Sequence, residues 1–381
     1  MDKKRLISFT QTLIRERSLS GEEKNVVLKI TSEMKSLGFD QISIDEYGSA
    51  VGIIKGEKPG KTLLLDGHCD IVDADKSGWK HNPFDAVIED GSLYGRGVAD
   101  MKGSLAAMMY AAANIDRHQL SGNVVVSASV LEEVMEGAAL KVVIENHKPD
   151  YVIIGEATNF NLNRAGRGRA EIIAETFGKS AHSSSPEVGL CAVHEMIKLI
   201  EAIEGLTFSS DPIIGHSQIT LTDIISEPFP GHSVVPNHCR ASFDRRLIPG
   251  ETPETILASM EILPALQSIK HKISFLDGEE KTYTGKIVKG LKFFPAWAVE
   301  EDHFLVQTAL KGFKNAGINS ELGAFKFCTN GSYSAGIAGI PTIGFGPGHE
   351  SDAHINNECL SVNDIERACD GYFHLIQSIL R

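Results

Sequence analysis

Acidic residues and histidines follow apolar stretches of this chain, and their types suit metal chemistry. In LLLDGHCDIVD, residues 63–73, three leucines typical of a buried strand end precede Asp66, His68, Asp70 and Asp73. A buried charge is costly unless it is paired or binds a metal ion. The stretch therefore raises the question of which cation, if any, these side chains hold.

Four other segments repeat this arrangement. They place Asp100 in LYGRGVADMKG, Glu132 and Glu133 after NVVVSASVL, Glu156 after YVIIG, and His354 after PTIGFGPGHESDA. The carboxyl ends of strands in an open α/β sheet share one edge, where ligands bind, so we expect the five segments to converge. Imidazole and carboxylate are good zinc ligands. Two histidines with three or four carboxylates suit two ions that share a bridging carboxylate, as in two-metal hydrolases.

Each segment alone also has a simpler interpretation. A His-x-Asp is often a surface turn, an adjacent pair of glutamates is often solvated, and a Gly-Glu after a strand is often a helix cap. Their joint occurrence at strand ends favours a site. Other chemistries lack their motifs, because the chain has no G-x-S-x-G, no H-E-x-x-H and no G-x-x-x-x-G-K-[ST].

The elements that must position these residues follow from the apolar pattern. Strands are predicted at 41–48, 50–56, 61–68, 122–130 and 150–157, and helices at 20–37, 103–120 and 136–147. Ser20 and Glu23 form a capping-box pattern at the start of the first of these helices. Alternating strands and helices predict an α/β sheet that is mostly parallel in its centre.

The pattern changes near residue 165, which predicts a second domain. With 381 residues, the chain is long enough for two domains. From 165 to 292 the strands alternate apolar and polar residues and two helices lie between them, as in a small α+β domain with one solvated sheet face. Because α/β alternation then returns, we expect a catalytic domain at 1–164 and 293–381 with an inserted domain at 165–292.

Charge and composition exclude several classes of partner. The chain has 37 basic and 50 acidic residues and a formal net charge of −13, which argues against nucleic acid and anionic membranes. Its first twenty residues lack the apolar centre of a signal peptide, so we expect a cytoplasmic protein. None of the six cysteines forms a C-x-x-C pair, which is typical of free thiols in a reducing compartment.

The order of the motifs resembles the M20 metallopeptidase family, which includes acetylornithine deacetylase and succinyl-diaminopimelate desuccinylase. The resemblance covers essentially the whole chain through DGHCDIVD, LYGRGVADMKG, LEEVMEGA, GEAT, GKSAHSSSPEVG and AHINNE. The segments YTG, FPAW and CTNGSYSAGIAGIPTIGFGPGHESDAH are most similar to a branch named as selenium-metabolism hydrolases.

The resemblance implies a role for each metal-site residue. His68, Asp100 and Glu156 would hold one zinc ion, and Asp100 would bridge to a second held with Glu133 and His354. His349 could compete with His354, but A-H-x-x-N-E matches the family at His354. Asp70 would orient His68, and Glu132 would be the general base that passes a proton to the leaving nitrogen.

The resemblance also implies a lid or dimerisation role for the inserted domain. His182 in GKSAHSS would reach the oxyanion, usually across a dimer interface, and Asn237 in VVPN would lie near the same oxygen. Arg246 in DRR could grip a substrate carboxylate. Asn330 in CTNG replaces an acid that many relatives have in a substrate-facing turn, so we expect it to affect substrate choice.

The predicted function is a two-zinc amide hydrolase that cleaves an N-acyl amino acid, as a cytoplasmic homodimer. Cobalt or manganese could replace zinc. A dipeptidase or carboxypeptidase acting on a short peptide is the alternative with the same site. A metal-binding protein without hydrolytic activity is the other alternative, and the presence of Glu132 with all the ligands favours the enzyme.

Overall fold

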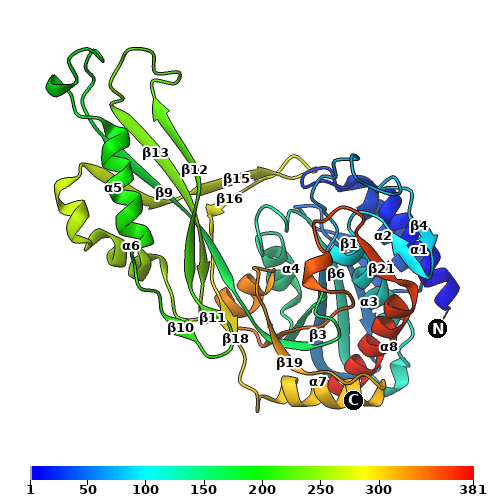
Figure 1. The fold of residues 1–381 in the computed structure, drawn as a ribbon. Helices are drawn as coiled ribbons and strands as arrows, with labels where there is room; N and C mark the ends of the chain where they lie inside the picture. The colour runs from blue at the N-terminus through cyan, green and yellow to red at the C-terminus, as the bar shows by residue number, and fades with distance from the viewer. Residues whose placement is uncertain (1) are drawn as a thin grey trace. The chain divides into compact units, whose positions relative to one another are not determined.

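The computed structural model describes residues 2–381 and divides them into two compact units (Figure 1). The first unit contains the chain up to Gly166, Glu279–Lys289 and Trp297–Arg381. The second contains Arg167–Gly278 and Gly290–Ala296. The sequence placed all of 165–292 in the inserted domain, but Glu279–Lys289 packs with the first unit. Two hydrogen bonds attach this segment to the first unit: the Tyr283 hydroxyl donates to the Gly48 carbonyl at 2.8 Å, and the Thr284 hydroxyl donates to the Glu46 carbonyl at 2.9 Å.

A nine-stranded sheet forms the centre of the first unit, in the order β1-β2-β6-β3-β7-β20-β8-β18, with β19 paired to β8. The neighbours β6, β3, β7 and β20 run parallel, whereas β1, β2 and β18 pair antiparallel with their neighbours. The strand β8 pairs antiparallel with β20 and β18 but parallel with β19. The predicted fold class, α/β with a mostly parallel centre, is therefore confirmed. The strands are β1 (Gln41–Ile44), β2 (Ala50–Lys55), β3 (Lys58–His68), β6 (Ser121–Ser129), β7 (Tyr151–Ile154), β8 (Leu162–Gly166), β18 (Trp297–Ala298), β19 (Leu322–Phe325) and β20 (Thr342–Gly344).

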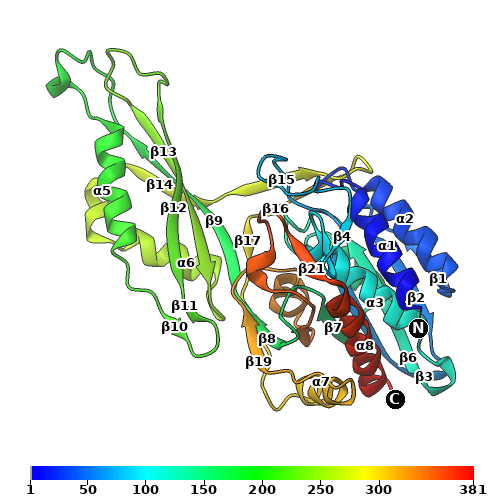
Figure 2. The ribbon, with the colours of Figure 1, turned by 45° about the vertical axis from the view of Figure 1, so that its right-hand side comes forward.

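Helices pack on this sheet and on one another. The helix α3 is rich in Ala, Leu and Met and is buried along nearly its whole length, because it packs against both α1 and α8 (Figure 2). Among the described residues, no helix is both long enough and apolar enough to cross a membrane. The helices are α1 (Lys3–Arg15), α2 (Lys24–Ser36), α3 (Gly103–Ala113), α4 (Leu140–His147), α7 (Phe304–Asn315) and α8 (Val362–Ile379).

Short elements complete the first unit. They are the helical turns η1 (Val98–Lys102), η2 (Arg117–Gln119), η5 (Ser332–Ile337) and η6 (Glu350–Asp352), and the small sheet β4 (Val87–Glu89), β5 (Ser92–Tyr94) and β21 (Cys359–Ser361). The hairpin of β15 (Asp277–Lys281) and β16 (Ile287–Leu291) is divided: Glu279–Lys289 belongs to the first unit, and the two outer ends of the hairpin belong to the second. None of the six cysteines forms a disulfide bond.

The capping box predicted for Ser20 and Glu23 is wrong. The helix α2 begins only at Lys24, and neither side chain forms the predicted cap at its start. Instead the Ser20 hydroxyl donates to the Asp70 carboxylate at 2.8 Å, and the Glu23 carboxylate accepts from the backbone N–H groups of Gly21 and Leu131. Tertiary partners at the strand ends have replaced the local capping bonds.

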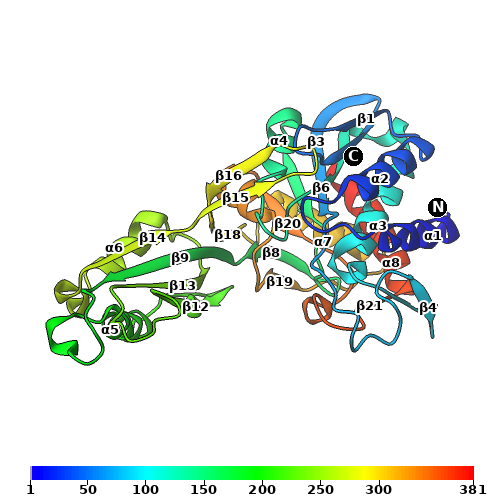
Figure 3. The same ribbon diagram turned by 90° about the horizontal axis from the view of Figure 1, so that it is seen from above.

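The second unit is an antiparallel sheet with helices on one face. The sheet has the order β12-β13-β9-β14, and β9, β13 and β12 lie side by side (Figure 3). Side chains alternate between buried and half-buried along β13, and the buried ones pack with α5 and α6. The elements are β9 (Gly168–Phe177), η3 (Pro186–Val188), α5 (Ala192–Glu204), β10 (Ser210–Asp211), β11 (Gly215–His216), β12 (Gln218–Glu227), β13 (His238–Leu247), α6 (Pro253–Glu261), η4 (Pro264–Ser268), β14 (His271–Phe275) and β17 (Phe293–Phe294).

Candidate metal centre and active site

The acids and histidines of the first unit meet at the carboxyl ends of its parallel strands. His68 is the last residue of β3, Glu132 and Glu133 follow β6, and Glu156 follows β7. Asp100 lies in η1 and His354 follows η6. Because β6, β3, β7 and β20 are parallel neighbours, their carboxyl ends share one edge and bring these segments together.

Asp100 lies between the two histidines. Its Oδ1 is 2.9 Å from Nε2 of His68, and its Oδ2 is 3.1 Å from Nε2 of His354. Each histidine also faces one further acid: Oε1 of Glu156 is 3.4 Å from Nε2 of His68, and Oε2 of Glu133 is 3.1 Å from Nε2 of His354. One carboxylate thus links two groups of possible ligands.

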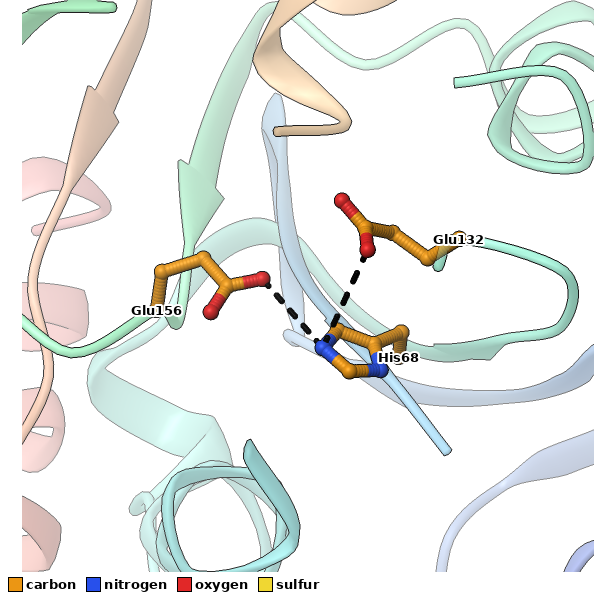
Figure 4. A group of neighbouring side chains, drawn as sticks. All are labelled: His68, Glu132 and Glu156. Atoms are coloured by element: carbon orange, nitrogen blue, oxygen red, sulfur yellow. Dashed lines mark ion pairs between the residues drawn. The ribbon is translucent and has the colours of Figure 1, made fainter. Parts of the chain in front are cut away.

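Glu132 points toward the same ring nitrogen. Figure 4 shows Glu132 and Glu156 directed at His68, and Oε2 of Glu132 is 4.0 Å from Nε2. Ligand atoms of His68, Glu132 and Glu156 lie within 4.8 Å of one another, and so do those of His68, Asp100 and Glu133. His354 lies outside both clusters, yet its 3.1 Å contacts with Asp100 and Glu133 place it at the same centre.

The pKa values of Glu132 and Glu156 reflect burial together with crowding of like charge. Burial raises the pKa of Glu132 well above its ordinary value, and burial with the charge of Asp100 raises the pKa of Glu156 to about 8. Hydrogen bonds to Asp100 and Glu133 raise the pKa of His354 to about 10. Burial alone would lower the pKa of His68, but Glu156 and Asp100 raise it well above its ordinary value. The centre therefore binds positive charge strongly.

These residues fit two divalent cations. Imidazole nitrogen and carboxylate oxygen are the ligands that zinc takes in catalytic sites, and the ion-pair partners of Asp100, Glu133 and Glu156 are the two histidines. Cations bound at this centre would replace the protons that crowded acids otherwise hold. His68, Asp100 and Glu156 could hold one ion, and Asp100, Glu133 and His354 the other.

Asp70 acts through its backbone as well as its carboxylate. The Nδ1 of His68 is 2.9 Å from the carbonyl oxygen of Asp70 but 3.6 Å from its carboxylate. The carbonyl therefore orients the ring and leaves Nε2 for a ligand. The Asp70 carboxylate accepts from the N–H groups of Glu132 at 3.2 Å and Glu133 at 3.1 Å.

Two further buried acids hold the site loops, and sequence reasoning missed both. Glu23 accepts from the N–H of Leu131 at 3.1 Å, where the chain adopts a φ of +59° just before the glutamate pair. Glu358 accepts from the N–H groups of Ala99 at 2.8 Å and Asp100 at 3.2 Å. Both are fully buried. The sequence offered one signal for each: Glu23 is the last acid of SLSGEE and Glu358 is the last acid of AHINNE, and each lies beside an apolar segment.

Asn330 does not lie as the sequence suggested. Asn330 is only 3% exposed, and its side chain is bonded to Asp66 and to the Gly137 N–H, so it contacts the protein interior rather than a substrate-facing surface. His349 is exposed, and its ring accepts from the backbone of Asp352 at the start of η6. His354, not His349, contacts Asp100.

The second unit carries the other three predicted residues. His182 is exposed, and its Nδ1 accepts from the Ser184 N–H at 3.1 Å, so in a neutral ring Nε2 carries the proton. Asn237 is exposed, and its backbone carbonyl accepts from the Gly178 N–H. Arg246 is half-buried on β13 and pairs with Asp244 at 2.7 Å.

Comparison with known proteins identifies the family of this chain. The sequence pattern of "Peptidase family M20/M25/M40" matches residues 64–378. The chain is 33% identical over 358 residues to "Uncharacterized protein YgeY" of Escherichia coli (strain K12), covering 92% of this chain and 88% of that protein. It is 26% identical to acetylornithine deacetylase of Photorhabdus laumondii subsp. laumondii, covering 95% and 92%.

A solved structure shares the fold. Aminopeptidase PepT from Bacillus cereus ATCC 10987 is similar with a TM-score of 0.78 and 19% identity, covering 100% of this chain and 99% of that one. At this identity the likeness supports the fold, while the sequence matches support the family. The chain belongs to peptidase family M20/M25/M40 and is a hydrolase that acts on amide or peptide bonds.

Proposed function

We propose that this protein is a two-zinc hydrolase that removes the acyl group from an N-acyl amino acid, with Glu132 as general base. The observation that carries the proposal is the placement of His68 and His354 on opposite oxygens of Asp100, with Glu132 directed at the same centre. Two bound cations would polarise the substrate carbonyl and lower the pKa of a water molecule.

Glu132 has the properties of a proton carrier. Its carboxylate is buried, and burial raises its pKa, so it holds a proton more readily than an exposed glutamate does. It would take a proton from the attacking water and deliver it to the leaving nitrogen. Its backbone N–H is held by Asp70, which limits how far the carboxylate can move.

The second unit would complete the site through His182 in a homodimer. The Ser184 N–H occupies Nδ1 of His182, so the Nε2–H is the donor available to a developing oxyanion. Asn237 would lie near the same oxygen. Arg246 would bind a substrate carboxylate in place of its present partner, Asp244. An inserted domain, the cytoplasmic location and the homodimer remain part of this proposal.

A screen with matched substrates tests the proposal. Zinc-loaded protein is given N-acetyl amino acids, dipeptides, N-acetyl dipeptides and the carboxyl-amidated form of each, and the released products are identified and compared with those of Glu132→Gln protein. A deacylase releases acetate from the N-acetyl amino acids, whereas a dipeptidase requires a free α-amine. A carboxypeptidase releases the C-terminal amino acid from N-acetyl dipeptides and loses this activity when the carboxyl group is amidated. Metal analysis before and after chelation should show two ions lost together with activity.

The dipeptidase and carboxypeptidase remain the second candidates, since they use the same centre. Cleavage confined to dipeptides with a free amine would replace the deacylase proposal. Cobalt and manganese are tested by reloading the chelated protein with each metal alone. A protein that binds two ions yet cleaves none of the substrates screened would instead support the non-hydrolytic alternative.

A further inference from the structure

A buried carboxylate lies beneath the candidate centre and has no part in the mechanism above. Asp66, near the end of β3, is only 1% exposed. Its Oδ1 accepts from the hydroxyls of Ser127 and Ser129 on β6, each at 2.5 Å. Its Oδ2 accepts from Nδ2 of Asn330 at 2.8 Å. Asp66 therefore joins two central strands to the turn that begins η5.

Asn330 also forms a hydrogen bond with the loop that follows the glutamate pair. Its Oδ1 accepts from the N–H of Gly137 at 2.6 Å, on the side of the amide opposite to Asp66. Gly137 has a φ of +76°, and a Cβ there would lie 2.5 Å from Cβ of Tyr333, so the backbone comes close to η5 at this point. The Asn330 amide is the bridge between Asp66 and Gly137.

The segment 131–137 is thus held at both ends. At its start, Glu23 accepts from the Leu131 N–H, and Asp70 accepts from the N–H groups of Glu132 and Glu133. At its C-terminal end, the Asn330 side chain accepts from the Gly137 N–H. We propose that Asn330 is a positioning residue that fixes the C-terminal end of this segment, and thereby the carboxylates of Glu132 and Glu133. The catalytic consequence rests on the proposed function; the structural one does not.

The chemistry of both neighbours selects an amide at position 330. Gly137 offers an N–H and needs an acceptor, whereas the Asp66 carboxylate needs a donor. Asparagine supplies one of each. Asn330→Asp keeps the acceptor for Gly137 but brings two carboxylates together in the interior, where like charges repel strongly. The added change Asp66→Asn restores the match, because the amide at position 66 can donate to the carboxylate at position 330 and accept from Ser127 and Ser129.

The test compares Asn330→Asp, Asp66→Asn, and the double variant Asp66→Asn/Asn330→Asp in the full-length protein. Deuterium uptake of the peptide spanning 131–139 reports on the segment without any substrate. On a substrate that the wild type cleaves, kcat and KM report on Glu132. Ser332→Ala is the matched control, because Ser332 is buried in the same turn and its hydroxyl has no hydrogen-bond partner among the described residues.

We expect Asn330→Asp to speed exchange in 131–139 and to lower kcat by about ten- to a hundred-fold with little change in KM, since small misplacements of catalytic groups cost this much. The double variant should return both the exchange rate and kcat most of the way to the wild-type values. Asp66→Asn alone should change the exchange rate and kcat only slightly. If Asn330→Asp does not fold, Asn330→Ala supplies the exchange measurement.

Two results would overturn the proposal: wild-type exchange in every variant at position 330, or a double variant no better than Asn330→Asp while folded. If the wild type cleaves none of the substrates screened, the proposed function fails, but the exchange data still decide the role of Asn330.

Discussion

Glu132 and Glu133 are adjacent in the chain, yet their carboxylates face different histidines. Oε2 of Glu132 lies 4.0 Å from Nε2 of His68, whereas Oε2 of Glu133 lies 3.1 Å from Nε2 of His354. Asp70 holds the backbone N–H groups of both and so fixes this division. The two neighbours are therefore suited to different tasks.

Substitution of each glutamate should separate these tasks. Glu132→Gln keeps the size of the side chain and removes the base, so turnover should fall by about a hundred- to ten-thousand-fold while two metal ions remain bound. Glu133→Gln should lower the occupancy of one metal site. Turnover and elemental analysis on the same samples check both. Wild-type turnover in Glu132→Gln would assign the base to another residue.

Glu23 should make stability depend on pH. Burial and the charge of Asp70 raise its pKa to about 7 in the folded protein, above the ordinary 4.5. Between these values the folded chain binds more protons than the unfolded chain, so the stabilisation present below pH 4.5 is lost as the pH rises through 7. Glu23→Gln keeps an acceptor for Gly21 and Leu131 but removes the titration.

The free energy of unfolding of Glu23→Gln, relative to the wild type, should therefore rise between about pH 5 and pH 8, by at most about 3 kcal/mol. Urea unfolding in the presence of a chelator measures this without metal binding. Glu22→Gln is the matched control, since Glu22 is an exposed neighbour, and its difference from the wild type should not vary with pH. A flat profile for Glu23→Gln would show that Glu23 titrates alike in both states.

Arg96 and Glu358 form a buried ion pair whose removal should be costly. Nη1 of Arg96 lies 2.7 Å from Oε2 of Glu358, with side chains 4% and 0% exposed. Arg96→Met leaves a buried carboxylate without its cation, which typically costs about 3–5 kcal/mol of unfolding free energy. Lys141→Met, which breaks the exposed pair with Glu145, should change it by less than about 0.5 kcal/mol. A loss below about 1 kcal/mol in Arg96→Met would mean that the backbone donors alone satisfy Glu358.

Mixing of inactive subunits tests the role proposed for His182. If His182 serves the partner's centre in a homodimer, Glu132→Gln chains mixed with His182→Ala chains should regain activity. Each mixed dimer would then contain one site with both residues intact. Turnover is measured after subunit exchange and compared with each parent. Native mass spectrometry shows whether mixed dimers form, and no recovery in their presence would place His182 in its own chain's site or in none.

Much of the architecture was predictable because it depends on short-range patterns. The strand that contains the apolar run at 63–65 ends at His68, and the run at 151–154 ends just before Glu156, so the apolar pattern alone predicted strands that terminate at ligand-type residues. The parallel centre of the sheet followed from alternating strands and helices, and the structure confirms it. These features depend on residues close in sequence, whose spacing the chain displays directly.

The partners of buried polar groups were decided only by the tertiary structure. Ser20 and Glu23 have the spacing of a helix cap, yet they bond to Asp70 and to the Leu131 N–H, 50 and 108 residues away. Asn330 lies in a turn that suggested contact with substrate, but it bridges Asp66 and Gly137, 264 and 193 residues away. A side chain can bond to any complementary group that folding brings within about 3 Å. Spacing along the chain cannot identify that group, because it depends on how distant strands and loops are packed.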